Sequence, residues 1–303
     1  MLQTTIARTV SYTGVGLHSG KDVQMRLQPA PADSGIVFYV HTPSGVRHIA
    51  PRPSAVSATA LATTLSDGQA SVSTVEHVLA ALAGMAVDNV QVHVFGGEIP
   101  IMDGSAVQAA ALLKEAGLRS LHAPRRVARV RRPLSVAGDG KAIHVWPHNG
   151  FYVDYTIDFP HASIGKQRLS LEITPDTFAE IAFARTFGFL QEVEYLHSRG
   201  LALGGSLGNA VVLDEQGVVN PEGLRRPDEF VRHKMLDFVG DMAMLGMPLQ
   251  GAFEVHCSGH QLNNAFLRRL SEERGAYLEI VSLTRESAPA YEGEAFPAMV
   301  VPA

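Results

Sequence analysis

The chain has 303 residues, a length that suggests about two domains, and its 46% hydrophobic and 18% charged residues exclude an intrinsically disordered protein. The net charge of −5 argues against a nucleic-acid partner, because such proteins carry a basic excess. The single cysteine, Cys257, cannot form an intramolecular disulfide, which favours a reducing cytoplasm.

The sequence carries no sign of a membrane or a secretory route. Its N-terminus lacks the charged start and apolar run of a signal peptide. The longest apolar stretch, Val78 to Val87, is far shorter than a membrane span. We therefore expect a soluble cytoplasmic protein with no transmembrane segment, and we expect it to be a monomer.

The first half begins with short strands and then becomes helical. Apolar and polar residues alternate as in strands, proline and glycine separate the segments, and apolar residues at three- and four-residue spacing indicate helices. Gly117 ends the last helix of this half. In chain order, the predicted elements are strands at residues 9–14 and 23–27, a helix at 74–86, a strand at 90–95 and a helix at 105–115.

The second half repeats this order after a candidate linker at residues 124–126. Its basic run, residues 125–132, is interpreted as a strand or linker and not as a phosphate-binding patch. Strands are predicted at residues 127–130, 143–146 and 151–159, and helices begin near Thr174 and Pro227, with proline and acidic residues in the first turn. The pattern in each half thus predicts one α+β layer, and the two layers are expected to pack together.

Three short motifs carry residues suited to metal chemistry. On a helix, His233, Asp237 and Asp241 share one face, because they are spaced four residues apart. An imidazole and a carboxylate one turn apart can chelate a metal, although the spacing taken alone favours a solvent-facing polar stripe with a local His–Asp hydrogen bond. The apolar residues around them favour a buried helix, where charged groups need partners.

The other two motifs are also ambiguous when each is taken alone. Glu76 and His77 offer a carboxylate beside a metal-binding imidazole, yet Ser73 with Glu76 also fits a helix capping box. His260 follows Gly259, whose backbone freedom could turn the ring into a cleft, and a hydrogen-bonded structural histidine is the alternative.

The order of these motifs resembles one known family. The chain is similar to the UDP-3-O-acyl-N-acetylglucosamine deacetylases, zinc-dependent hydrolases of lipid A biosynthesis, from Thr9 to about Asn264. The resemblance rests on residues 14–20, 72–77, 88–89, 100–105, 184–188, 230–237 and 258–260, which occur in the same order and at similar spacing.

The resemblance implies a fold of two similar α+β domains. Each is expected to be a layered β-α-α-β unit, with the helices sandwiched between sheets and the active site between the domains. Residues 1–123 would form the N-terminal domain and residues 127–303 the C-terminal domain. An insert at about residues 190–212 would guide the acyl chain of an acylated UDP-sugar.

The resemblance also assigns the metal site. The zinc ligands would be His77, His233 and Asp237, with a fourth position open for water, as catalytic zinc chemistry requires. Fe2+ could occupy the same ligands. The reaction implied is hydrolysis of the substrate's N-acetyl group with release of acetate, the committed step of lipid A biosynthesis.

The catalytic groups follow from the same blocks. Glu76 would be the general base, and His260 the general acid, held or polarised by Asp241. Thr186 would donate to the tetrahedral oxyanion. Lys234 would contact charged or polar groups of the substrate.

The substrate contacts implied by the resemblance are less specific. Phe187 would wall the cleft, Phe159 lies in a block associated with the nucleotide, and His18 would have an accessory role. Cys257 departs from the family, whose members often carry Lys there, and this could alter diphosphate affinity.

Two other classes of protein could use the same ligands. Two histidines and a carboxylate also form the facial triad of non-haem Fe(II) oxygenases. A separate base and acid favour hydrolysis over that chemistry. A binding protein with a structural metal is the second alternative, but structural zinc sites are usually closed and rich in cysteine.

Overall fold

The first of two large sheets is built from the N-terminal third of the chain. The computed structural model describes residues 1–283, and this sheet has the order β2-β3-β9-β4-β5. Alternation places Val23, Met25 and Leu27 in the core. The strands are β2 (Val10–Val15), β3 (Asp22–Pro29), β4 (Ile36–Thr42), β5 (Gly45–Ile49) and β9 (Val90–Phe95).

The second large sheet contains seven strands, all from residues after 125. Its main path is β12-β13-β19-β11-β20, and β14 pairs with both β19 and β15. The strands are β11 (Arg126–Val130), β12 (Leu134–Gly138), β13 (Lys141–Trp146), β14 (Phe151–Phe159), β15 (Gly165–Glu172), β19 (Leu249–His256) and β20 (Leu278–Ser282).

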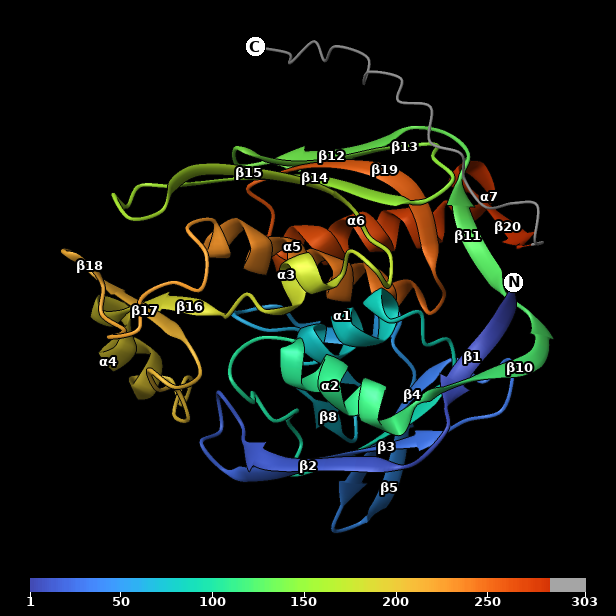
Figure 1. Ribbon diagram of the computed structural model, residues 1–303, viewed down its shortest axis with the longest axis horizontal. Helices are drawn as coiled ribbons and strands as arrows, with labels where there is room; N and C mark the ends of the chain where they lie inside the picture. Colours follow the sequence, from blue (N-terminus) through green and yellow to red (C-terminus); the bar gives the residue numbers. More distant parts are fainter. Residues whose placement is uncertain (284–303) are drawn as a thin grey trace.

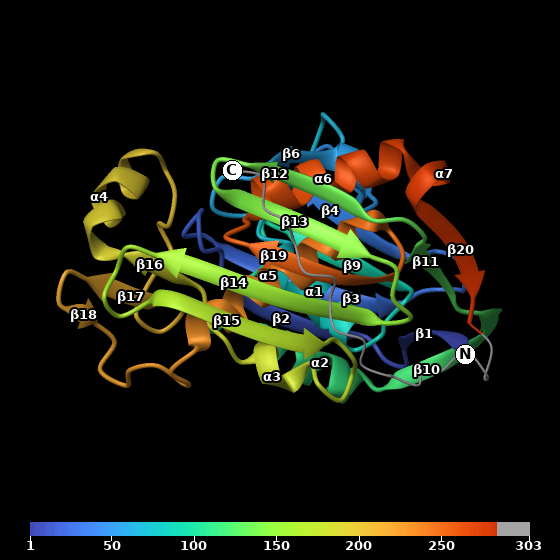
Figure 2. The same ribbon diagram turned by 90° about the horizontal axis from the view of Figure 1, so that it is seen from above.

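Helices fill the space between these two sheets (Figure 1). Seen from above, the second sheet covers α5 and α1 (Figure 2). The α-helices apart from α4 are α1 (Glu76–Gly84), α2 (Val107–Ala116), α3 (Ala179–Ala182), α5 (Glu229–Met242), α6 (His260–Glu272) and α7 (Arg274–Tyr277). Two short 3-10 helices are η1 (Pro53–Ala55) and η2 (Ala243–Leu245).

Smaller sheets complete the fold. One of them, with α4 (Leu190–Ser198), projects from one end of the molecule (Figures 1 and 2). It consists of β16 (Phe187–Phe189), β17 (Val211–Asp214) and β18 (Gly217–Val218). The others pair β1 (Leu2–Ile6) with β10 (Leu118–Pro124), and β7 (Thr64–Ser66) with β6 (Val56–Ala58) and β8 (Ser71–Val72).

Helices α1 and α5 touch backbone to backbone. A Cβ at Gly240 of α5 would lie 2.0 Å from the main-chain oxygen of Glu76, the first residue of α1. Only glycine allows this approach, because any side chain would overlap the neighbouring backbone. The contact brings the start of α1 against the C-terminal part of α5, where Asp237 and Asp241 lie, with His233 one turn before Asp237.

The predicted α+β fold, with helices between sheets, is confirmed. The strands predicted at 90–95 and 151–159 have the observed bounds of β9 and β14. One helix start was wrong: residues 175–178 form turns, and α3 begins only at Ala179. The domain boundary at residues 124–126 stays a prediction, and residues 284–303 of the expected C-terminal domain lie outside the described residues.

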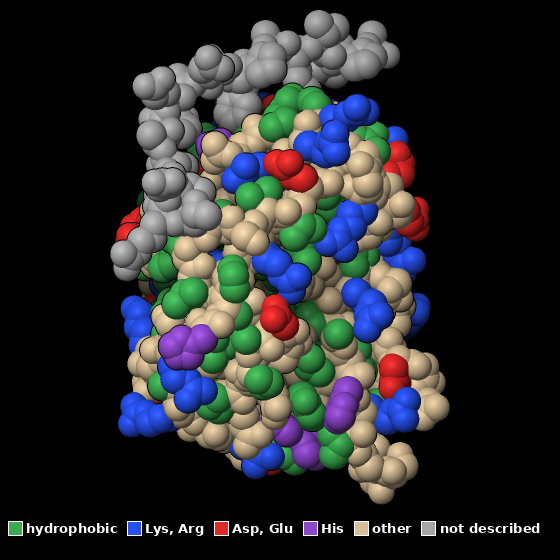
Figure 3. Space-filling model, turned by 90° about the vertical axis from the view of Figure 1, so that its right-hand side faces the viewer, with side chains coloured by type: hydrophobic (Ala, Val, Ile, Leu, Met, Phe, Trp, Pro, Cys, Tyr) green, Lys and Arg blue, Asp and Glu red, His purple; other side chains and the backbone are tan. Residues whose placement is uncertain are grey.

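The basic run at residues 125–132 includes strand β11, as interpreted from the sequence. Arg125 pairs with Asp88 and Arg126 with Asp33, both at 2.8 Å. On the face that carries β1, β10 and β11, Lys and Arg side chains are scattered among apolar ones (Figure 3). Among the described residues, no helix is long and apolar enough to cross a membrane.

We predict that Gly240→Ala destabilises the protein by about 1–3 kcal/mol or more, because the added methyl group must push α1 and α5 apart. Chemical denaturation measures the change. Gly275→Ala is the matched control, since a Cβ on that helical glycine meets nothing within 4 Å. Equal stability of the two variants would contradict the close helix contact.

Candidate active site

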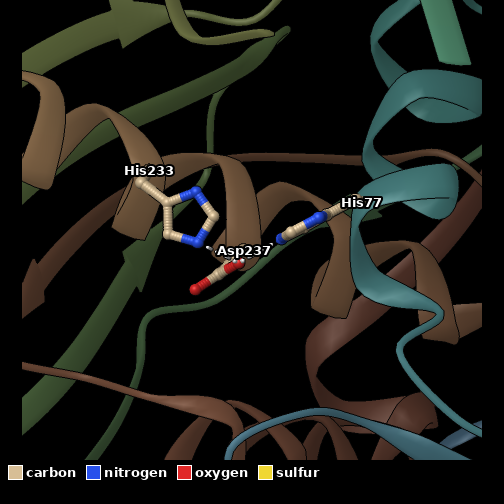
Figure 4. A group of neighbouring side chains, drawn as sticks. All are labelled: His77, His233 and Asp237. Carbon is tan, nitrogen blue, oxygen red and sulfur yellow. Dashed lines mark ion pairs between the residues drawn. The ribbon is translucent and has the colours of Figure 1, made fainter. Parts of the chain in front are cut away.

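Two helices bring the predicted metal ligands together. His77 is the second residue of α1, and His233 and Asp237 lie one turn apart on α5. Their ligand atoms all lie within 4.8 Å of one another, and all three residues are buried. Figure 4 shows the His77 side chain pointing from α1 toward the pair on α5. The solvent-facing polar stripe considered for this face of α5 is therefore wrong.

The separations of these atoms suit a tetrahedral metal. Nε2 of His77 lies 3.4 Å from Oδ1 of Asp237, and Nε2 of His233 lies 3.3 Å from the same oxygen. Ligand bonds of about 2.0–2.1 Å at tetrahedral angles place donor atoms about 3.4 Å apart. The donor set therefore fits an ion such as Zn2+.

Hydrogen bonds prepare His233 and Asp237 as ligands. Nδ1 of His233 donates to the main-chain oxygen of Ala184 at 3.1 Å, which leaves the Nε2 lone pair facing Asp237. Burial lowers the pKa of His233 to about 3, so the ring is neutral at pH 7. Nζ of Lys234 donates to Oδ2 of Asp237 at 2.8 Å, which leaves Oδ1 for a metal.

Neighbouring side chains keep the Asp237 carboxylate ionised despite its burial. Burial would raise its pKa, but His233, Lys234 and a hydrogen bond from His77 together hold that pKa well below its usual range. A buried carboxylate beside two imidazoles is suited to a cation.

Glu76 lies beside this centre, at the start of α1. Glu76 is 3% exposed, and its Oε2 accepts a hydrogen bond from the main-chain N–H of Thr63 at 3.0 Å. Burial raises the pKa of Glu76, while His260 and His77 oppose the shift. The capping-box alternative is wrong, because Val75 occupies the N-cap position of α1 with no side-chain cap.

His260 forms a second buried pair with Asp241. Nδ1 of His260 donates to Oδ2 of Asp241 at 2.8 Å, and Asn263 donates to the same oxygen at 2.7 Å. Burial alone would lower the pKa of His260, but the charge and hydrogen bond of Asp241, with Glu76 beside them, raise it to about 10.

The backbone before His260 turns at a different residue from the one predicted. Gly259 is extended, with φ −153°, and does not supply the turn. Cys257 has φ +49° instead, a conformation that is costly for a residue with a side chain. Thr74, two residues before Glu76, is also left-handed at φ +59°. Left-handed backbone therefore lies two residues before Glu76 and three residues before His260.

The segment that contains Thr186 is fixed on several sides. Its N–H donates to the oxygen of Gly104 at 2.7 Å, and its own oxygen accepts from Val211 at 2.8 Å. Arg185 makes a buried ion pair with Glu229, with Nε and Oε1 2.9 Å apart. Ala184, whose oxygen accepts the hydrogen bond of His233, thus directly precedes two anchored residues.

Aromatic side chains form a wall beside His233. The Phe187 ring centroid lies 6.2 Å from that of His233 and 5.6 Å from that of Phe159. Nζ of Lys234 lies 5.5 Å from the Phe187 ring centroid, although its hydrogen-bond partner is Asp237. The predicted contact residues Phe187, Phe159 and Lys234 therefore lie together.

His18 is linked through Glu98 to Thr74, which lies two residues before Glu76. Its N–H donates to Glu98 at 2.8 Å, and the hydroxyl of Thr74 donates to the same carboxylate oxygen at 3.1 Å. Its oxygen accepts from Leu203 in the insert at 3.2 Å. The insert expected to guide the acyl chain thus docks on the loop of His18.

Sequence reasoning missed several residues that support the site. Thr63 donates to both Glu76 and Asp241, Asn263 also donates to Asp241, and Glu229 holds Arg185. The presence of Arg185 in a matched block was the one available signal. Thr63 carries no motif, because its role depends on contacts made across the fold.

The fold and the site together define a class. The site has the components of a metal-dependent hydrolase. Two imidazoles and a carboxylate converge, a second carboxylate lies beside them, and a buried imidazole–carboxylate pair completes the group. The sequence matches the family described as UDP-3-O-acyl N-acetylglycosamine deacetylase over residues 3–272. The chain belongs to this family.

Similar proteins cover nearly the whole chain. A UDP-3-O-acyl-N-acetylglucosamine deacetylase of Nitratidesulfovibrio vulgaris is 61% identical over 283 residues, which are 93% of this chain and 92% of that protein. The enzyme of the same name from Oleidesulfovibrio alaskensis is 56% identical over 299 residues, 98% of each chain. That of Pseudomonas entomophila is 44% identical over 290 residues, covering 95% of this chain and 96% of its own.

We predict that His233→Ala and Asp237→Ala each lower metal affinity at least tenfold, because each removes one of three protein ligands. Elemental analysis after dialysis against zinc measures the bound metal. His144→Ala is the control, since that ring bonds to Ser135 on the outer sheet. Full occupancy in either ligand variant would show that the ligand set is wrong.

Proposed function

We propose that this chain hydrolyses the N-acetyl group of UDP-3-O-acyl-N-acetylglucosamine and releases acetate, the committed step of lipid A biosynthesis. One observation carries the proposal: buried Glu76 and the His260–Asp241 pair lie beside the His77, His233 and Asp237 group. The names of the similar proteins supply the substrate.

Glu76 acts as the base of the reaction and His260 as the acid. Glu76 takes a proton from the attacking water while the oxygen of that water bonds to the acetyl carbon. His260 gives a proton to the amide nitrogen as the carbon–nitrogen bond breaks, because an amine leaves poorly unless it is protonated. Thr186 donates to the oxyanion that forms between these steps. The products are acetate and a free amine.

Zn2+ held by His77, His233 and Asp237 would supply Lewis acidity for the amide carbonyl and for the attacking water. Fe2+ fits the same nitrogen and oxygen donors. Lys234 fixes Asp237 through Oδ2, and Ala184 fixes His233 through Nδ1, so both ligands keep their orientation.

The substrate contacts extend away from this centre. Phe187 and Phe159 wall the cleft beside His233, and Lys234 lies where it can reach polar groups of the sugar nucleotide. The segment at residues 190–212, with Leu190, Tyr195 and Leu203 exposed, would guide the acyl chain. His18 supports that segment. We further propose that the enzyme works as a monomer in the cytoplasm.

We predict that the purified protein releases acetate from the acylated sugar nucleotide, that a chelator stops the reaction and that zinc restores it. Glu76→Ala should keep its metal and lose about 10²–10⁴-fold in kcat, since a positioned base contributes that much. Acetate assays, elemental analysis and thermal melting are run on the same samples. A folded, metal-loaded Glu76→Ala with normal turnover would remove Glu76 from the reaction.

The pH profile tests the acid. His260 must carry its proton to act, so kcat/KM should fall as the pH rises through the pKa of His260, which Asp241 helps to raise to about 10 and which a bound cation would lower. Asp241→Asn removes the buried charge that favours the imidazolium. We therefore predict that this variant moves the alkaline limb to lower pH.

Asp154→Asn is the matched control for this experiment, because Asp154 is also a buried carboxylate but bonds to Arg168. Its alkaline limb should stay in place. An unchanged limb in both Asp241→Asn and His260→Gln, with fold and metal preserved, would exclude His260 as the acid.

A further inference from the structure

Thr63 contacts both halves of the catalytic machinery. It precedes β7 and is 2% exposed. Its N–H donates to Oε2 of Glu76 at 3.0 Å, and its hydroxyl donates to Oδ1 of Asp241 at 2.8 Å. Thr63 thus donates hydrogen bonds both to Glu76, the proposed base, and to Asp241, which holds the proposed acid His260.

The hydroxyl of Thr63 determines how the Asp241 carboxylate is used. With Oδ1 occupied by Thr63, Oδ2 accepts from His260 and from Asn263. Asn263 is itself fixed, because its amide oxygen accepts from the Ser258 hydroxyl at 2.6 Å. The imidazole of His260 therefore takes its orientation from a carboxylate that is held on both oxygens.

Thr63 is in turn anchored to the start of α1. Its main-chain oxygen accepts from the N–H of Val75 at 3.4 Å, one residue before Glu76. Hydrogen bonds of Thr63 thus join its loop to helix α1 and helix α5 at this point. A shift of Thr63 would change the positions of Glu76 and of Asp241 at once.

The packing behind Thr63 leaves little room for a substitute for its hydroxyl. A void of about 10 Å³ is lined by Thr63 and Asp241 together with Val56, Met244, Asn264 and Leu267. That volume is at the lower limit for one water molecule. A valine at position 63 has the same shape as threonine and would keep water out.

We propose that Thr63 is a positioning residue that couples the base to the acid, because it donates one hydrogen bond to Glu76 and another to Asp241. The inference rests on the proposed function for its catalytic meaning. Thr63 touches no reacting atom. Its hydroxyl keeps the Asp241–His260 pair aligned with the carboxylate of Glu76.

The test compares Thr63→Val, Thr63→Ser and Thr64→Val in the metal-loaded enzyme. Thr63→Val keeps the N–H bond to Glu76 and removes only the hydroxyl, so we expect kcat to fall about tenfold to a hundredfold with KM within twofold. Bound metal should stay unchanged. Thr63→Ser should restore the rate, and the neighbouring Thr64→Val, which makes neither bond, should behave as wild type.

The alkaline limb gives a readout that loss of folding alone would not move. Glu76, Asp237 and Asp241 are the charged groups that act on His260. Without the Thr63 hydroxyl, the charge of Asp241 is less neutralised and holds the imidazolium more tightly. The limb in Thr63→Val should therefore move to higher pH, opposite to the shift in Asp241→Asn.

Direct titration of the His260 ring by NMR separates this inference from the proposed function. The ring should titrate at higher pH in Thr63→Val than in the wild type, whatever reaction the protein catalyses. If the wild type releases no acetate, the proposed function fails while the NMR shift still decides the role of Thr63. An unmoved His260 titration in folded Thr63→Val, or a rate loss matched by its loss of folded protein, would overturn the coupling.

Discussion

The contact between Gly240 and the backbone of Glu76 is the constraint on which the site depends. It fixes the distance between α1 and α5, and every proposed metal ligand lies on one of these two helices. Sheets on both outer sides hold the helices in place, so neither can tilt to relieve a wider spacing. A side chain at position 240 would separate His77 from Asp237 before it affected any surface of the protein.

The second requirement is that buried charges are matched. The core between the sheets holds Glu76, Asp237 and Asp241 as acids, and each has a donor or a cation directly beside it. Such groups cost free energy when they lose a partner, because water cannot replace it in the interior. The same low dielectric strengthens every interaction among them, which sets the protonation states that the chemistry uses.

The sequence predicted the components better than their arrangement. The family resemblance implied His77, His233 and Asp237 as ligands, where each motif alone had stayed ambiguous, and the structure places their ligand atoms within 4.8 Å of one another. Spacing could not show that the Ser73 capping box is absent or that Cys257 turns the backbone before His260. Those outcomes depend on contacts from distant segments. The part played by Thr63 was hidden for the same reason, since nothing local distinguishes it from other threonines.

The proposed metal ligands come from two helices that are far apart in the sequence, and this affects the entropy of the unfolded chain. His77 and the α5 ligands are separated by roughly 150 residues, so an ion that binds both closes a very long loop. In the chain-entropy description, a covalent cross-link across a loop of that length is worth about 5 kcal/mol. A metal bound here would thus stabilise the fold as well as take part in the reaction. Its release would increase the conformational entropy of the unfolded chain between the two helices.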